Sequence, residues 1–157
     1  MTRREVFYMK QHRRAFSVSI FVRHEDAILL VMHKRLKKWL PVGGECEGGE
    51  APLQAAQREL FEETGIEEYR LAKLPAHPSG VEGPPGFMLY EEHDAGDKGL
   101  HMNFVFLVIV PNRDIPKPCN EFTEARWFSG DEQDLFFEEA GVHVGKLVRY
   151  GLSVEPT

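Results

Sequence analysis

Residues 44–66 read GECEGGEAPLQAAQRELFEETGI, and this stretch decides the fold class of the chain. From Ala51 to Thr64 the apolar residues recur three or four positions apart, which predicts a helix with one buried face. The residues of that face are Leu53, Ala56, Leu60 and, less strictly, Thr64. Pro52 suits the first helical turn and Gly65 suits a helix C-cap. The glycine pairs before the helix predict a loop over Gly43–Gly49 that lets the backbone approach a ligand closely.

Three carboxylates mark the second half of this helix. Glu59, Glu62 and Glu63 stand at positions i, i+3 and i+4, so they share one face. Like charges at that spacing repel by roughly 0.2–0.5 kcal/mol per pair, and the C-terminal end of a helix disfavours anions. A divalent cation would offset this repulsion, because Mg²⁺ and Mn²⁺ prefer grouped oxygen ligands. The competing interpretation is an acidic helix face exposed to water.

The same stretch resembles the Nudix box, G-x5-E-x7-R-E-U-x-E-E-x-G-U, in which U is aliphatic. All nine constrained positions between Gly44 and Ile66 match. The resemblance implies one Nudix domain over residues 1–157, an α/β/α sandwich with a mixed β-sheet between helices. It also implies a hydrolase that uses Mg²⁺ or Mn²⁺ to break the pyrophosphate bond of a nucleoside diphosphate linked to another moiety, X.

The resemblance implies a role for each residue of the box. Metal binding falls to Glu59, Glu62 and Glu63, together with the carbonyl group of Gly44. Arg58 is expected to orient a box glutamate together with Glu50 through charge-assisted hydrogen bonds. Gly65 is expected to end the helix, and Leu60 and Ile66 to lie in the core.

The general base is left open by the sequence. The candidates are Glu59 and Glu62 in the box and two glutamates of the segment NEFTEARWF, Glu121 and Glu124. This segment resembles the family strand that follows the box. We favour Glu121 as an additional metal ligand or base, and its alternative role is a surface salt bridge.

Substrate contacts are expected outside the box, in three groups of residues. The basic group before the box holds His33, Lys34, Arg35, Lys37, Lys38 and Trp39. The other two groups are Tyr90–His93 and the pair His101 and Asn103, which share one face of a strand. A long Pro- and Gly-rich loop, Pro75–Gly86, is a candidate lid. The alternatives are solvated charges for the basic residues and simple packing for Trp39.

The remaining segments predict a sheet with helices at the end of the chain. Alternation and β-forming residues predict strands at Phe16–Arg23, Ala27–His33, Tyr69–Leu74, Phe87–His93, Leu100–Val110 and Phe122–Phe128. The first two strands form a hairpin, and Trp39–Pro41 is a short extended piece. Asp131–Ala140 and Val142–Leu152 read as helices, and residues 1–15 as a flexible or helical arm.

Composition and charge bound the class of protein. The 157 residues carry a net charge of -6, with ten Lys or Arg against three Asp or Glu in residues 1–40 and nine against twenty-two afterwards. The acidic majority argues against nucleic acid as a partner. Cys46 and Cys119 follow no disulfide or metal pattern, and no apolar run is long enough to cross a membrane, so we expect a cytoplasmic protein.

Three readings of the function stay open at this point. The favoured one is a hydrolase acting on a small nucleotide derivative, as a monomer or a homodimer. The second is a catalytically silent Nudix-fold module that binds nucleotides. The third is a pyrophosphohydrolase acting on RNA 5′ ends, which the basic first 40 residues keep open.

Overall fold

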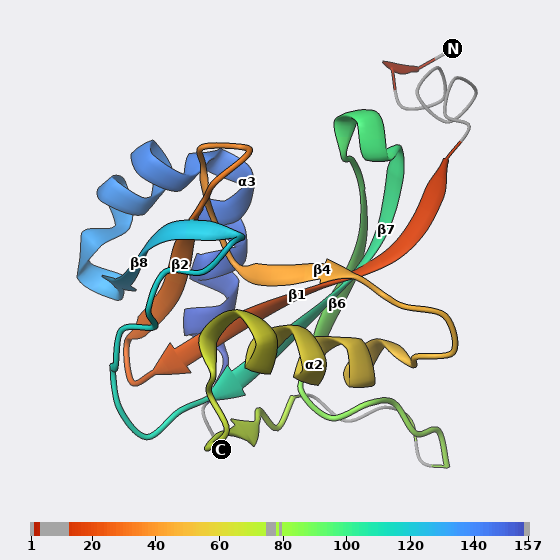
Figure 1. Cartoon of the computed structure of the whole chain (residues 1–157). Coiled ribbons are helices and arrows are strands. Elements are labelled where there is room, and N and C mark those ends of the chain that lie inside the picture. The colour runs from red at the N-terminus through yellow and green to blue at the C-terminus, as the bar shows by residue number, and fades with distance from the viewer. Residues whose placement is uncertain (1, 4–12, 75–77, 79, 156–157) are drawn as a thin grey trace.

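A computed structural model describes residues 2–3, 13–74, 78 and 80–155 of the chain (Figure 1). The strands are β1 (Arg14–His24), β2 (Ala27–His33), β3 (Trp39–Leu40), β4 (Val42–Glu45), β5 (Arg70–Leu71), β6 (Phe87–Asp94), β7 (Leu100–Ile109) and β8 (Phe122–Ser129). The helices are α2 (Pro52–Thr64) and α3 (Gln133–Ser153), with short 3₁₀ turns η1 (Gly96–Lys98) and η2 (Gly130–Glu132). Among the described residues, no helix is both long and apolar enough to cross a membrane.

The strands form one mixed sheet around β1. Strand β1 pairs in parallel with β7 along its whole length, from Arg14 opposite Leu100 to Arg23 opposite Ile109. On its other side it pairs antiparallel with β4 and then with β2. Strands β8 and β3 pair with β2, while β6 and β5 pair with β7, all antiparallel. The predicted hairpin of the first two strands and the mixed sheet are confirmed.

The two faces of the sheet are covered by different helices (Figure 1). Side chains alternate along β1, so Val18, Ile20 and Val22 pack in the cluster that also contains Leu60 of α2. Phe21 points the other way, into the cluster built on Phe136 and Val148 of α3. These two apolar layers account for the α/β/α sandwich.

Local signals set the ends of both helices. The backbone N–H of Ala51 donates to Oε1 of Gln54 at 2.8 Å, and Pro52 starts α2. Gly65 has φ of 71°, the left-handed conformation of a C-cap, and its N–H donates to the carbonyl of Phe61 at 2.8 Å. Gly141, with φ of 85°, kinks α3 between the two predicted helical segments. The predicted ends of α2 and the break at Gly141 are therefore confirmed, whereas α3 begins at Gln133, two residues after the predicted start at Asp131, because residues 130–132 form the turn η2.

Two strand predictions need correction. Val42–Glu45 is a strand, β4, because its backbone pairs with Ser17–Ile20 of β1, so the Gly-rich loop begins only at Cys46. The strand predicted over Tyr69–Leu74 is limited to Arg70–Leu71, the part that pairs with β7. The predicted arm over residues 1–15 is too long, because β1 already begins at Arg14 and pairs there with β7. Residues 1 and 4–12 of that arm, and residues 75–77 and 79 of the predicted lid, lie outside the described residues.

Candidate active site

Two glutamates of α2 lie against the glycines of β4. A Cβ atom added to Gly44 would lie 2.5 Å from Oε1 of Glu59, so only glycine leaves room for this carboxylate. Glu63 is 8% exposed, although a helix residue with a carboxylate is normally left in water. Burial raises the pKa of Glu63 to about 8, with a further contribution from the Glu59 carboxylate. The helix therefore presents two close, half-buried or buried acids to the backbone of β4.

Arg58 is the cation that this acidic group already contains. Its Nε and Nη2 atoms donate to the two carboxylate oxygens of Glu50 at 2.7 and 3.0 Å. Its Nη1 atom donates to Glu59 at 2.9 Å and to Glu62 at 3.1 Å. The bidentate pair with Glu50 raises the pKa of Arg58, so it stays charged. Arg58 therefore connects the carboxylates of Glu50, Glu59 and Glu62.

Glu121 approaches the same region from a different part of the chain. Its negative charge contributes to raising the pKa of both Glu59 and Glu63, after the larger effect of burial. The main chain before β8 holds it there, because the N–H of Lys34 donates to the carbonyl of Glu121 at 2.9 Å. Glu124 lies on β8 opposite Met32 and is exposed.

The carboxylates of Glu59, Glu62 and Glu63 suit a divalent cation, but in this structure they do not converge on one position. Glu62 is 55% exposed at its side chain and turns toward Arg58. Within the described residues, no three His, Cys, Asp or Glu side chains converge on a common position. Glu63 is buried and Glu59 is partly buried; the two are like-charged neighbours, and Arg58 pairs only with Glu59. An uncompensated buried carboxylate is costly, so hard-cation binding fits this pair.

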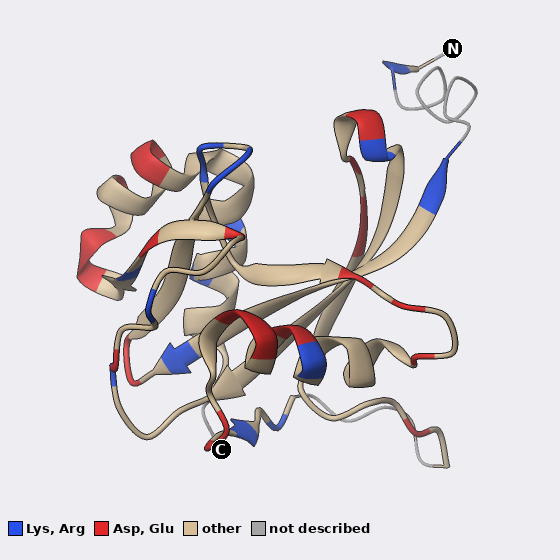
Figure 2. Cartoon of the chain, in the orientation of Figure 1, with Lys and Arg blue, Asp and Glu red and all other residues tan. Residues whose placement is uncertain are grey.

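The basic segment before β3 is a turn whose tip is exposed (Figure 2). Nδ1 of His33 accepts the N–H of Leu36 at 3.1 Å, so this histidine stabilises the turn. Arg35 is exposed. Trp39 is 5% exposed, packs edge-on against Phe128 and donates from Nε1 to Glu139 at 3.2 Å. Stacking of a base on Trp39 is therefore wrong, because its ring is already used in packing.

The predicted pair His101 and Asn103 lies on the α3 face of the sheet, in a polar network. Asn103 is 1% exposed; its side chain accepts from Ser17 at 2.9 Å and donates to Ser19 at 3.0 Å. It also donates to Oε1 of Glu91 at 3.1 Å. Ser17 and Asn103 are buried in this network, and the hydrogen bond from Asn103 holds the partly buried Glu91 in place.

His101 belongs to a second group at the N-terminal end of β1. Its Nε2 lies 2.9 Å from Oε2 of Glu45, and Arg13 donates to both carboxylate oxygens of Glu45 at 2.7 and 2.6 Å. Hydrogen bonding by Arg13, opposed by burial and helped by His101, lowers the pKa of Glu45 to about 2. Tyr90 is exposed and donates to Glu92 at 2.8 Å.

Sequence reasoning missed five residues of these networks: Arg13, Ser17, Ser19, Glu45 and His143. His143 of α3 lies 2.9 Å from Glu91 and joins the helix to β6. Glu45 follows Gly44 directly, and its place opposite Ser17 depends on β4 being a strand. Alternation along β1 could have placed Ser17 on the face of Phe21, but His143 carries no local signal.

Comparisons with solved structures agree with this architecture. A hydrolase of the Nudix family from Clostridium perfringens superposes with a TM-score of 0.74 and 25% identity, covering 89% of this chain and 97% of that one. The Escherichia coli dihydroneopterin triphosphate pyrophosphohydrolase shares the fold at 17% identity, with a TM-score of 0.64 and coverage of 88% and 94%.

Sequence comparison gives a second group of relatives and a family match. An NAD-capped RNA hydrolase, NudC, from Salmonella schwarzengrund is 29% identical over 120 residues. That alignment covers 75% of this chain but only 40% of the relative, so the chain matches less than half of that protein's length. The model of the NUDIX domain matches residues 11–136, a span that includes the whole box and Glu121. The chain belongs to the Nudix family.

Proposed function

We propose that this protein is a metal-dependent pyrophosphohydrolase that cleaves a nucleoside diphosphate linked to another moiety, X. The observation that carries the proposal is the pair Glu59 and Glu63, held against the glycines of β4 with Arg58 beside only one of them. Such a pair needs a cation in order to stay ionised. Family membership supports the same conclusion.

The residues that would hold the metal are Glu59, Glu63 and the carbonyl group of Gly44. Glu62 would join them after it gives up its hydrogen bond with Arg58. That hydrogen bond is exposed to solvent. Mg²⁺ or Mn²⁺ bound there neutralises phosphate charge and lowers the pKa of bound water. Arg58, fixed by Glu50, keeps Glu59 oriented toward β4 throughout.

Glu121 is our choice for the general base. It belongs to the segment before β8 and not to α2, and its charge acts on both Glu59 and Glu63. Its side chain is exposed, which leaves it accessible to a water molecule. It would take a proton from the water that attacks phosphorus. The other three candidates are less suitable. Glu59 and Glu62 are both hydrogen-bonded to Arg58. Glu124, unlike Glu121, is not among the charges that raise the pKa of Glu59 or Glu63.

Substrate contacts are proposed at groups outside the box, of which Arg35 and Tyr90 are exposed and His101 is partly buried. Arg35 and the other cations of the β2–β3 turn suit distal phosphates, and His101 and Tyr90 suit polar groups of the nucleoside. The NudC relatives are NAD-capped RNA hydrolases, so the NAD cap of RNA is a candidate substrate. A cytoplasmic location, and a monomeric or homodimeric state, stay predictions from the sequence.

The proposal is tested by product release from a panel of nucleoside diphosphate derivatives with Mg²⁺, with Mn²⁺ and with a chelator. We expect turnover only with metal. Binding of a nucleotide without turnover of any panel member would instead support the silent module. Cleavage of NAD-capped RNA but not of free NAD would support the RNA 5′-end alternative.

A second measurement tests the metal site without relying on activity. Mg²⁺ should raise the Tm of the wild-type protein, since a ligand that binds only the folded state stabilises it. Glu63→Gln should abolish this rise and lower turnover by at least about two orders of magnitude. Glu138→Gln removes an exposed carboxylate of α3 and is the matched control. A full Mg²⁺ response in Glu63→Gln would show that the metal site is misassigned.

A further inference from the structure

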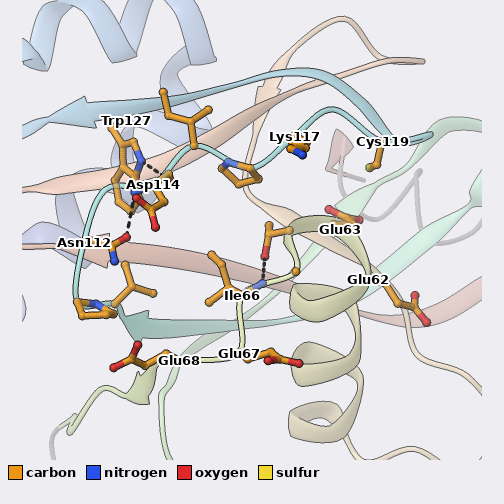
Figure 3. Close-up of a pocket in the computed structure, with 16 residues that line it drawn as sticks. Glu62, Glu63, Ile66, Glu67, Glu68, Asn112, Asp114, Lys117, Cys119 and Trp127 are labelled. Carbon is orange, nitrogen blue, oxygen red and sulfur yellow. Dashed lines mark hydrogen bonds between the residues drawn. The ribbon is translucent and has the colours of Figure 1, made fainter.

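A groove of about 660 Å³ is lined by Glu62 and Glu63 of the box and by the residues that follow the C-terminal end of α2 (Figure 3). Glu62 and Glu63 form one end of it. One wall is the chain that leaves α2, Gly65–Glu68, and the opposite wall is the segment between β7 and β8 together with Trp127. None of the substrate contacts proposed above lines this groove.

The middle of the groove is apolar and carries a flat aromatic ring. Ile66, Ile115 and Trp127 line it, and Ile115 is 65% exposed. The indole Nε1 of Trp127 donates to the carbonyl of Asp114 at 3.1 Å, which holds the ring against the segment that forms the opposite wall (Figure 3). An exposed isoleucine beside a fixed indole suits a ligand with an apolar or ring face.

The charges around the groove are predominantly negative. Beyond the two box acids, Glu67, Glu68 and Asp114 line it, and all three are exposed. Lys117 is the one Lys or Arg among its lining residues. A metal ion at the box would compensate Glu62 and Glu63 but not the three distant carboxylates. The far part of the groove therefore repels anions and attracts cations.

We propose that this groove binds moiety X, and that X is a neutral or cationic group with an apolar or ring face rather than a further phosphate. The inference rests on the proposed function. Glu63 belongs both to the acid pair that would hold the diphosphate and to the lining of the groove, so one of the two substituents of the diphosphate would extend into the groove. The shape and the charge of the groove then select among nucleoside diphosphates by the substituent that they carry.

A series of substrates that share one nucleoside tests the selection. The three members carry choline, glucose or a third phosphate on the nucleoside diphosphate, so that X is cationic, neutral or anionic. We expect kcat/KM with choline or glucose to exceed that with the triphosphate by at least about ten-fold. A preference for the triphosphate would overturn the inference while leaving the hydrolase proposal intact. Failure to cleave any member of this series or of the wider panel would overturn both.

Charge reversal at the far end of the groove tests the location. Glu67→Lys should raise KM for the choline derivative roughly two- to five-fold, the range of an exposed charge pair, with kcat little changed. It should lower KM for the triphosphate. Glu138→Lys makes the same charge change on the exposed side of α3 and should leave both values unchanged. If Glu67→Lys and Glu138→Lys changed KM equally, or if Glu67→Lys left KM unchanged, X would not bind in this groove.

Ile115→Asp provides a second variant that does not depend on the glutamates. Ile115 is exposed, so the fold does not rely on its burial. The new carboxylate should weaken binding of the glucose derivative, because the apolar wall of the groove is lost. An unchanged KM for the glucose derivative would contradict contact between X and this wall.

Discussion

Gly44 shows how a single missing side chain positions a catalytic group. Its neighbours on β4 and β1 fix the backbone, and the carboxylate of Glu59 fills the space in front of it. The nearest atoms to an added Cβ are all at the end of the Glu59 side chain, at 2.5 to 3.1 Å. That carboxylate can move, so the requirement for glycine here concerns the site more than the fold.

The substitution Gly44→Ala should therefore separate activity from stability. The added methyl group displaces Glu59 by about an ångström, and a misplacement of that size costs on the order of 10²-fold in turnover. The Tm should fall by only a few degrees. Gly48→Ala is the control, since a Cβ there meets no atom within 4 Å. Activity of Gly44→Ala within a few-fold of wild type would show that the position of Glu59 is not critical.

At the scale of elements, α2 is set by local chemistry and then placed by packing. Its start and its C-cap follow from Pro52 and Gly65, residues within one turn of each end. Its rotation about its own axis depends instead on the sheet, because Leu60 and Ala56 must face Val18 and Ile20. That rotation buries Glu63 and leaves Glu62 exposed, although the two are adjacent in sequence.

The C-cap gives a test of the element alone. Gly65 has a positive φ and no atom within 4 Å of an added Cβ, so Gly65→Ala costs only backbone strain. This strain is about 1 kcal/mol, which lowers the Tm by roughly 2–4 °C in a chain of this size. Gly65→Asn should lose less, since asparagine tolerates this conformation. If Gly65→Ala were as stable as wild type, residue 65 would not need the left-handed conformation and the prediction would be wrong. Thermal unfolding measures all three proteins.

At the scale of the whole molecule, Arg23 joins residues from opposite ends of the chain. It is 7% exposed and lies near the end of β1. Its Nη1 donates to the carbonyls of Gly151 and Val154, at 3.0 and 2.6 Å, and its Nε donates to the carbonyl of Glu25 at 2.6 Å. These bonds attach the C-terminal end of α3 to the sheet.

Loss of this connection should destabilise the protein as a whole. Arg23→Leu removes a charged donor and leaves buried carbonyls unsatisfied, so the free energy of unfolding should fall by about 3 kcal/mol. The Tm would drop by roughly 6–12 °C. Arg113→Leu removes an exposed ion pair with Asp26 and should cost less than about 1 kcal/mol. Denaturant unfolding of both variants measures the difference, and equal losses would contradict the role given to Arg23.

The sequence by itself determined the elements and the chemical class of the site. Strands with alternating residues, the ends of α2, the break at Gly141 and the row of Glu59, Glu62 and Glu63 were all predictable, because they depend on residues two to four positions apart. The same locality explains the errors. Strand β4 was missed because its sequence, VGGE, has only one β-forming residue, Val42. Its backbone becomes a strand by pairing with β1.

Tertiary structure alone decided which polar groups are buried, paired or exposed. Trp39 is taken into the core by Phe128, and Asn103 is satisfied by serines more than eighty positions away. The groove beside the box is formed by two segments whose residues lie far apart in the chain, so it has no local pattern. Burial and pairing depend on contacts between distant residues, and those contacts exist only once the sheet has brought its strands together.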